Sequence, residues 1–370
     1  MVLNESSANR QRTPVRLGLW SSEYSSLNGQ ALVTSRVMQV LSDLPWKSYT
    51  YPTGYLSMFL VAKNTMRLWK SLLVGDVDTI YLVCSRSGFG FVRDLPALMA
   101  SLVGVRVVVH VHGSDITTLL SGRWYSIFAR ALYKRSELVV PSQHLVPDIY
   151  NLAAAKKCIV CENFVTRELP FVAGREARAS PLNVLWNSNV VSSKGFFDVA
   201  DAVKCLHERG HRIKMTAVGA PLGDLEMSKA AVLRRLEELR GFDWMTYLGR
   251  QDEVSLRKLL LEADVVCLPS RYPSECQPLA IIQAMCSGKA IVVSDSPALR
   301  STVGEYPASV IAVGSKDELL AALRKFCEAE LPVIADEVQS LVNERFSTER
   351  FDREIRDILE AGDGRVGVSN

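Results

Sequence analysis

The sequence lacks the features that would place it in a membrane or a secretory pathway. No apolar run reaches the roughly 18 residues that a membrane-spanning helix needs, so we expect no transmembrane segment. Residues 1–14 are polar and have no apolar core of the kind found in secretory signals, so we expect a cytoplasmic protein. Glycine (22) and proline (15) occur at ordinary levels, which excludes collagen-like and low-complexity chains.

Signatures of metal and redox sites are also missing. Histidine is scarce (5), and no group of His, Cys and Asp has the spacing of a metal site. The eight cysteines are expected to be reduced thiols. Cys158 and Cys161 match C-x-x-C, but they lie in a short apolar run that indicates a strand, where residues three apart point to opposite faces. We therefore predict no metal and no cofactor.

Two further classes of ligand lack their sequence patterns. No G-x-G-x-x-G follows an apolar run, and the segment from Gly219 to Gly223 is a poor substitute, so a nicotinamide dehydrogenase is a weak alternative. Basic residues do not form a stripe interleaved with aromatic ones, so we predict no nucleic-acid partner.

What the chain does contain is a regular alternation of short apolar runs with longer segments of 3.6-residue period. Runs at residues 15–20, 79–84, 105–111, 138–140 and 158–160 predict buried parallel strands, with helices such as 31–41 and 124–133 between them. The alternation begins again, with runs at residues 183–186, 213–218, 245–248, 265–268, 290–293 and 310–313. Two series of βαβ units predict an α/β protein with two Rossmann-like, doubly wound domains facing across a cleft.

The domain boundaries follow from composition. We predict a first domain at residues 1–168, a linker at 169–181, a second domain at 182–345, and a C-terminal amphipathic helix within 346–370 that packs back on the first domain. The net charge of +3 is unevenly distributed. Residues 1–168 carry 18 Lys and Arg against 11 Asp and Glu, whereas residues 169–370 carry 25 against 29. A basic first domain and an acidic second domain indicate two surfaces with different partners.

The strand-to-helix segment at residues 268–288 has the most informative chemistry. A polar loop containing Glu275 leads into a helix that starts near Pro278. The first-turn N–H groups of a helix have no internal partners and the helix dipole is positive there, which suits a phosphate. The Glu275 carboxylate can accept hydrogen bonds from hydroxyl groups. Gln283 lies among apolar residues and needs a partner, because an unpaired buried amide costs roughly 1–3 kcal/mol.

This segment resembles the Glu-x7-Glu loop of retaining nucleotide-sugar glycosyltransferases of family 4 (glycosyl transferases group 1), which have the two-domain GT-B fold. Gln283 stands where that family usually has its second Glu. The turn from Asn189 to Lys194 and Gly195 is similar to the family's Arg-x4-Lys-Gly turn, whose basic residues hold the donor diphosphate. Asn189 takes the place of the Arg. The residues that match the loop in register are Pro269, Ser270, Glu275, Pro278, Leu279, Ala284 and Met285.

The resemblance implies a retaining, metal-independent transferase that moves a sugar from a nucleoside-diphosphate sugar, its co-substrate, to a glycan or lipid-linked saccharide in polysaccharide assembly. His112, followed by Gly113, is similar to the family's His-Gly turn, whose His faces the donor sugar. The implied catalytic residues are Glu275, Lys194 and His112. The implied donor-binding residues are Asn189, Lys194, Glu275, Pro278, Leu279, Gln283, Gly29, Gly249 and Arg250. Arg93, Ser114 and Asp115 are expected on the acceptor side.

Two alternatives stay open at this stage. Residues 63–70 and 122–135 carry basic residues beside apolar ones. Amphipathic helices that face the core are the ordinary interpretation, and contact with anionic lipid at the inner face of the membrane is the other. Asn189 and Gln283, both departures from the family pattern, also allow a non-catalytic scaffold protein in a glycan-assembly complex. Nucleotide binding would distinguish that protein from an enzyme.

Overall fold

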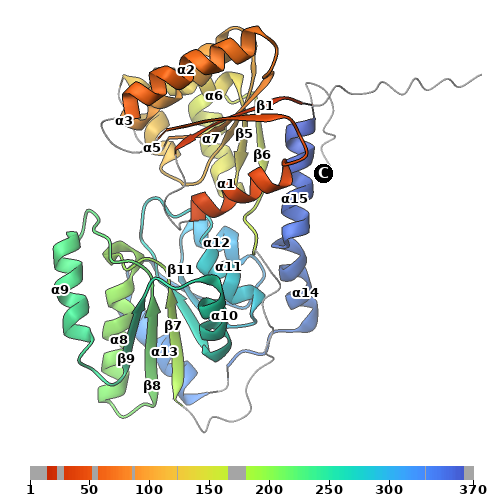
Figure 1. Cartoon of the computed structure of the whole chain (residues 1–370). Coiled ribbons are helices and arrows are strands. Elements are labelled where there is room, and N and C mark those ends of the chain that lie inside the picture. The colour runs from red at the N-terminus through yellow and green to blue at the C-terminus, as the bar shows by residue number, and fades with distance from the viewer. Residues whose placement is uncertain are drawn as a thin grey trace, which may run out of the picture.

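Two parallel sheets, one above the other in Figure 1, organise the chain. The computed structural model describes residues 15–22, 29–51, 57–85, 88–122, 124–165, 181–329 and 331–361. Within these residues each sheet has six strands, in the order β2-β1-β3-β4-β5-β6 and β12-β11-β10-β7-β8-β9. Both sheets reverse strand order near the middle and carry helices on both faces. The predicted fold class is therefore confirmed.

The first sheet contains one strand that the apolar runs do not predict. This strand, β2, lies at the sheet edge, and in its sequence WKSYTY only Tyr49 and Tyr51 are buried. An edge strand has one neighbour and is only half covered, so a continuous apolar run is not required of it. The strands of this sheet are β1 (Leu17–Ser22), β2 (Trp46–Tyr51), β3 (Thr79–Val83), β4 (Arg106–His110), β5 (Glu137–Val140) and β6 (Lys157–Val160).

Helices cover the two faces of the first sheet unequally. One face packs against α2, α4, α5, α6 and α7, which supply buried residues to a common core. The other face packs against α1 and, from the far end of the chain, α15. The bounds are α1 (Gly29–Val40), α2 (Ser57–Leu73), α3 (Gly88–Phe91), α4 (Leu95–Leu102), α5 (Ile116–Ser121), α6 (Tyr125–Arg135), α7 (Val146–Ala153) and α15 (Thr348–Glu360).

The second sheet and its helices enclose one continuous core. Its strands are β7 (Leu182–Asn187), β8 (Ile213–Val218), β9 (Met245–Gly249), β10 (Val265–Leu268), β11 (Ala290–Ser294) and β12 (Ser309–Ile311). The helices are α8 (Phe196–Glu208), α9 (Lys229–Leu239), α10 (Glu253–Glu262), α11 (Leu279–Cys286), α12 (Pro297–Val303), α13 (Lys316–Glu328) and α14 (Asp336–Arg345). The predicted linker lies outside the described residues except for Pro181. No helix in the described ranges has the length and apolarity to cross a bilayer.

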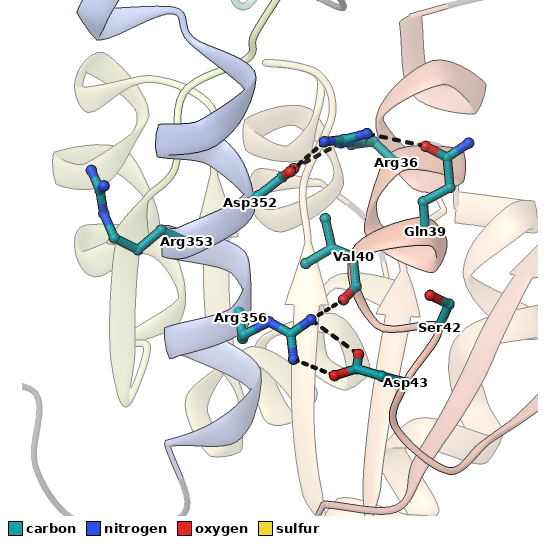
Figure 2. Close-up of a pocket in the computed structure, with 8 residues that line it drawn as sticks. All are labelled: Arg36, Gln39, Val40, Ser42, Asp43, Asp352, Arg353 and Arg356. Carbon is teal, nitrogen blue, oxygen red and sulfur yellow. Dashed lines mark hydrogen bonds and ion pairs between the residues drawn. The ribbon is translucent and has the colours of Figure 1, made fainter.

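The last helix, α15, follows the second domain in sequence but packs on the first. Its buried residues Phe351, Ile355 and Leu359 join the core beneath α1. Figure 2 shows the seam between the two helices, where Arg36 of α1 pairs with Asp352 and Arg356 pairs with Asp43. The Arg356 nitrogens lie 3.0 Å from the Asp43 oxygens. Apolar burial and two ion pairs together fix α15 to α1.

The two segments that cross between the sheets lie side by side. Val165, which precedes the undescribed residues 166–180, donates its N–H to the carbonyl of Phe346 at 3.0 Å. The Thr348 hydroxyl donates to the carbonyl of Val165 at 2.6 Å. Arg345 also pairs with Glu162. The crossing that leads into β7 and the one that leads into α15 are therefore held at one place.

Candidate active site at the interdomain cleft

A cavity of about 560 Å³ lies between the two domains, where the carboxyl ends of their strands meet. The first domain contributes Gln30, Val33, His112, Pro141 and Asn163 to its lining, and the second domain contributes the larger share. Eight of the residues implied by the resemblance line this cavity, namely His112, Asn189, Lys194, Arg250, Glu275, Pro278, Leu279 and Gln283. The fold therefore brings together side chains that are up to 171 positions apart in the sequence.

An ion pair between Lys194 and Glu275 stands on the second-domain wall of the cleft. The Lys194 Nζ atom lies 3.1 Å from Glu275 Oε2, and the two side chains are only 16% and 11% exposed. The Ser270 hydroxyl donates to the same Glu275 oxygen at 3.1 Å. The Tyr272 ring lies beneath the ammonium group, 5.4 Å from Nζ to the ring centre. Both charges are thus oriented before any ligand arrives.

The turn that carries Lys194 is fixed from both sides. Asp224 accepts a hydrogen bond from the Ser193 N–H at 2.8 Å, and the Arg271 N–H donates to the Ser193 carbonyl at 2.8 Å. Gly195 has φ +87°, and a Cβ at this position would lie 2.7 Å from the Pro269 carbonyl oxygen. Only glycine fits such a conformation and such a contact. The Lys-Gly pair therefore brings this turn against the Glu275 loop.

The start of α11 faces the cavity. Pro278 is its N-cap residue and has no side-chain cap, and Pro278, Leu279 and Ala280 all line the cleft. First-turn N–H groups have no acceptor within their own helix, and the dipole gives this end a partial positive charge. With Lys194 on the same wall, the site can offer an ammonium group and a helix end to an anion.

Gln283 and Asn189 stand where the resemblance leads us to expect charged residues. The Gln283 Oε1 atom accepts a hydrogen bond from Asn187 Nδ2 at 2.7 Å, which leaves its Nε2 to donate toward a ligand. Asn189 Oδ1 accepts from the Ala220 N–H at 3.2 Å and so steadies the turn after β8. Both amides have structural partners and both line the cavity.

His112 faces the cleft from the first domain, whereas His110 lies behind it. The two rings are 4.3 Å apart, and His110 Nδ1 is hydrogen-bonded to the Tyr81 hydroxyl. Burial, and secondarily the neighbouring His112, lowers the pKa of His110 well below its usual value, so this ring is neutral. His112 therefore lies at the cleft, and His110 packs behind it.

Ser114 and Asp115 touch the second domain. The Ser114 hydroxyl lies 2.7 Å from the carbonyl oxygens of both Pro273 and Glu275, and it can donate to one at a time. Asp115 Oδ2 accepts from the Ser274 hydroxyl at 3.3 Å. These two residues therefore connect the first domain directly to the loop that carries Glu275. Their acceptor role stays a prediction.

The remaining predicted residues lie at or beyond the rim. Gly29 begins α1 and precedes the cavity residue Gln30, but the turn before it, at residues 23–28, is outside the described ranges. Gly249 ends β9 with φ +68° and precedes Arg250. Arg93 is not among the residues that line the cavity. Its carbonyl accepts from Trp20 Nε1 at 2.8 Å, and its guanidinium lies 5.6 Å from the centre of the Tyr51 ring.

Sequence reasoning missed an interdomain amide pair. Gln277 Oε1 accepts from the Asn163 N–H at 2.6 Å, and Asn163 Nδ2 donates to the Gln277 carbonyl at 3.0 Å. Gln277 Nε2 in turn donates to Glu162. Gln277 lies between Glu275 and Pro278, so its place in the motif was the available signal. The pair fixes the start of α11 against the first domain.

Next to Arg93, Asp94 is fully buried and accepts hydrogen bonds from the Ser85 N–H and the Ser85 hydroxyl, both at 2.9 Å. Burial raises the pKa of Asp94 to about 7, against the lowering effect of these bonds and of Arg93. When the pKa of a carboxyl is higher in the folded protein than in the unfolded chain, the free energy of unfolding falls as the pH rises from the unfolded pKa to the folded one.

We therefore expect D94N to become more stable relative to the wild type as the pH is raised from about 5 to about 8. The relative gain should be at least about 1 kcal/mol, which corresponds to a little under one pKa unit. Urea unfolding at each pH measures the free energies. The comparison uses the difference between the two proteins because His110 and His144, whose pKa values are lowered by burial, act in the opposite direction. If the difference in free energy of unfolding between D94N and the wild type were the same across this pH range, the prediction would be contradicted.

Comparison with solved structures identifies the fold. HepE from Anabaena, in complex with UDP, is 16% identical with a TM-score of 0.69 over 93% of this chain and 99% of its own. Sucrose-phosphate synthase from Thermosynechococcus elongatus is 14% identical with a TM-score of 0.72 over 93% and 98%. The lipopolysaccharide outer core galactosyltransferase WaaB, in its apo form, is 13% identical with a TM-score of 0.63 over 92% and 98%. The architecture is that of a GT-B protein.

A family model matches the sequence of the second domain. Residues 177–339 match the model of the family described as glycosyl transferases group 1. The second domain is therefore similar to this family, in agreement with the resemblance of the motifs around Lys194 and Glu275. No curated protein sequence matches the chain.

Proposed function

We propose that this protein is a glycosyltransferase that moves a sugar from a nucleoside-diphosphate sugar to a saccharide or lipid-linked saccharide. The observation that carries the proposal is the preformed Lys194–Glu275 pair beside the start of α11, inside the cleft of a glycosyl transferases group 1 domain. HepE, a structural neighbour, has been solved with UDP and with UDP-glucose. WaaB, another neighbour, is named for transfer to lipopolysaccharide.

In this proposal the donor lies mainly on the second domain. The diphosphate replaces Glu275 as the ion-pair partner of Lys194. It also accepts hydrogen bonds from the N–H groups in the first turn of α11. The Glu275 oxygens then become available to accept hydrogen bonds from the hydroxyls of the donor sugar. Gln283, which is hydrogen-bonded to Asn187, contacts the ribose. Arg250, which follows β9 and lines the cavity, lies near the nucleobase. The ligand replaces one ion pair with another, so Lys194 keeps a charged partner throughout.

Catalysis would be chiefly electrostatic. When the bond between the sugar and the diphosphate breaks, negative charge grows on the leaving oxygen. Lys194 and the helix end are already placed to meet that charge, without reorganisation at the moment of reaction. Because these groups offset part of the diphosphate charge themselves, we propose a reaction that needs no metal ion. Retention of the anomeric configuration is proposed from the family resemblance.

The acceptor would enter from the first-domain side, where His112 faces the donor sugar. Ser114 and Asp115 hold this side against the Glu275 loop, so closing the domains excludes water from the transferred sugar. Eight free cysteines support function in a reducing compartment, and we propose the cytoplasmic side of a membrane.

Calorimetry against a panel of nucleoside diphosphates, followed by a donor and acceptor screen read by mass spectrometry, tests the proposal. We expect one nucleotide to bind and one donor to give a product heavier by one sugar. Glu275→Ala should abolish most transfer, whereas Glu337→Ala, at an exposed position on α14, should leave it unchanged. Wild-type turnover by the Glu275 variant with the correct donor and acceptor would contradict this site.

A second candidate function, a non-catalytic scaffold, rests on Asn189 and Gln283. Such a scaffold protein would differ from the transferase in binding no nucleotide. We expect Gln283→Glu to bind the nucleotide about three- to tenfold more tightly. The new carboxylate can accept from Asn187 and from a ribose hydroxyl at once, and hydrogen bonds to charged groups are worth about 1 kcal/mol more. Calorimetry measures this change, and weaker binding would show that the ribose does not contact this side chain.

A further inference from the structure

The outward surface of three first-domain helices is apolar to an unusual degree. Helices α2, α4 and α6 cover the same side of the first sheet and bury one stripe each in a common core. Their opposite stripes are not polar. Large apolar side chains on this surface, which we call the outer face, are between 58% and 83% exposed. They are Phe59, Met66, Leu73, Leu102, Trp124 and Ile127. Figure 1 shows α2 and α6 on the side of the first domain away from the second sheet.

This surface bears on the two interpretations that the sequence leaves open for residues 122–135. Trp124, Ile127 and Phe128 share a helical face with Leu132 in the pattern, and the ordinary interpretation turns that face toward the core. Leu132 is buried, but the other three are 67%, 69% and 43% exposed. Ala129 and Tyr133 take the inward positions instead. A single helix pattern shows that two stripes differ, and it does not show which stripe faces the core.

The charge on the outer face has one sign. The sequences of α2, α4 and α6 contain no Asp and no Glu. Their exposed charged residues are all basic, namely Lys63, Arg67, Lys70, Arg130, Lys134 and Arg135. Exposed helices of the second domain differ, since α9 and α13 mix acidic with basic residues as ordinary solvated helices do.

We propose that the outer face docks on an anionic lipid bilayer. Exposed aromatic and aliphatic side chains beside lysine and arginine are the combination that binds the boundary between headgroups and acyl chains. A second copy of this chain is a poor occupant, because a twofold contact would bring six cations against six cations. Charge complementarity therefore favours an acidic surface.

The position of the outer face relative to the cleft suits a lipid-borne acceptor. In a parallel α/β sheet, helices begin at the carboxyl edge of the strands, which is the cleft edge here. Phe59 and Trp124 lie at or just before the beginnings of α2 and α6, so the exposed aromatics stand at that edge. This inference rests on the proposed function and specifies its acceptor as lipid-linked.

Vesicle flotation of the full chain tests the proposal. We expect the wild type to float with phosphatidylcholine vesicles that contain phosphatidylglycerol and not with phosphatidylcholine alone. K63Q/R67Q/K70Q should bind about a hundredfold more weakly, because each basic residue near such a surface contributes about fivefold. F59S/M66S/I127S should lose at least about tenfold. The matched control K229Q/R234Q/K258Q, at exposed positions of the second domain, should bind like the wild type.

Nucleotide calorimetry and light scattering on the same proteins separate the outcomes. Unchanged nucleotide affinity in both first-domain variants, with the flotation losses above, supports the proposal. Equal flotation with both vesicle types, or no effect of either variant, overturns it. A wild-type dimer that F59S/M66S/I127S dissociates would assign the outer face to a contact between copies and also overturns it. If no nucleotide binds while the flotation pattern holds, docking stands and the proposed transferase function fails.

Discussion

Replacing Lys194 by alanine is expected to lower kcat by about 10²–10³-fold, the usual loss when one preorganised donor to developing charge is removed. Lys194 is mostly buried, and its turn is fixed by Gly195 and Asp224, so its ammonium group is preorganised. A cation in contact with a phosphate at about 4 Å interacts with up to about 4 kcal/mol at an effective dielectric near 20. Since Asn189 carries no charge, this part of the site depends on Lys194.

The measurement is steady-state transfer together with calorimetry of the matching nucleoside and nucleoside diphosphate. The variant should bind the nucleoside diphosphate more weakly and the nucleoside with unchanged affinity, because Lys194 contacts only the phosphate groups. Lys325→Ala, an exposed lysine on α13, is the control and should change neither quantity. Equal losses for nucleoside and diphosphate would show that Lys194 supports the fold of the site instead.

Replacing Phe351 by alanine is expected to lower the free energy of unfolding by about 3–5 kcal/mol, as for other large buried aromatics. Phe351 is fully buried, and its ring centre lies 4.4 Å from that of Phe164. The loss arises in the first domain although the residue follows the second domain in the sequence, because α15 completes the core beneath α1.

Urea unfolding monitored by circular dichroism measures this change. Leu341→Ala, at a position of α14 that is 65% exposed, is the control and should stay within about 0.5 kcal/mol of the wild type. A loss below about 1 kcal/mol for the Phe351 variant would mean that α15 is not anchored in the first-domain core.

The fold was largely predictable because buried parallel strands are continuous apolar runs. The strand β2 was not predicted, since it lies at an edge and buries only Tyr49 and Tyr51 among polar residues and an exposed Trp46. In the site, Lys194, Glu275 and Gln283 were found because they follow strand ends in a motif with many matching positions. The pairing of Gln277 with Asn163 was missed because it joins residues of different domains, 114 positions apart. The outward position of Trp124 and Phe128 could not be predicted, because helical periodicity does not show which face of a helix packs on the core.

The adjacent crossings at Val165 and Phe346 have a mechanical consequence. A single connecting segment would let the domains swing and twist in many directions. Two segments tied together by the Val165–Phe346 and Thr348–Val165 hydrogen bonds act as a double-stranded hinge with a short, defined axis. The first turn of α1, whose Gln30 lines the cleft, belongs to the same body as α15. The tie at Val165 therefore restricts the relative motion of the two domains, and Gln30 moves with α15 as one unit.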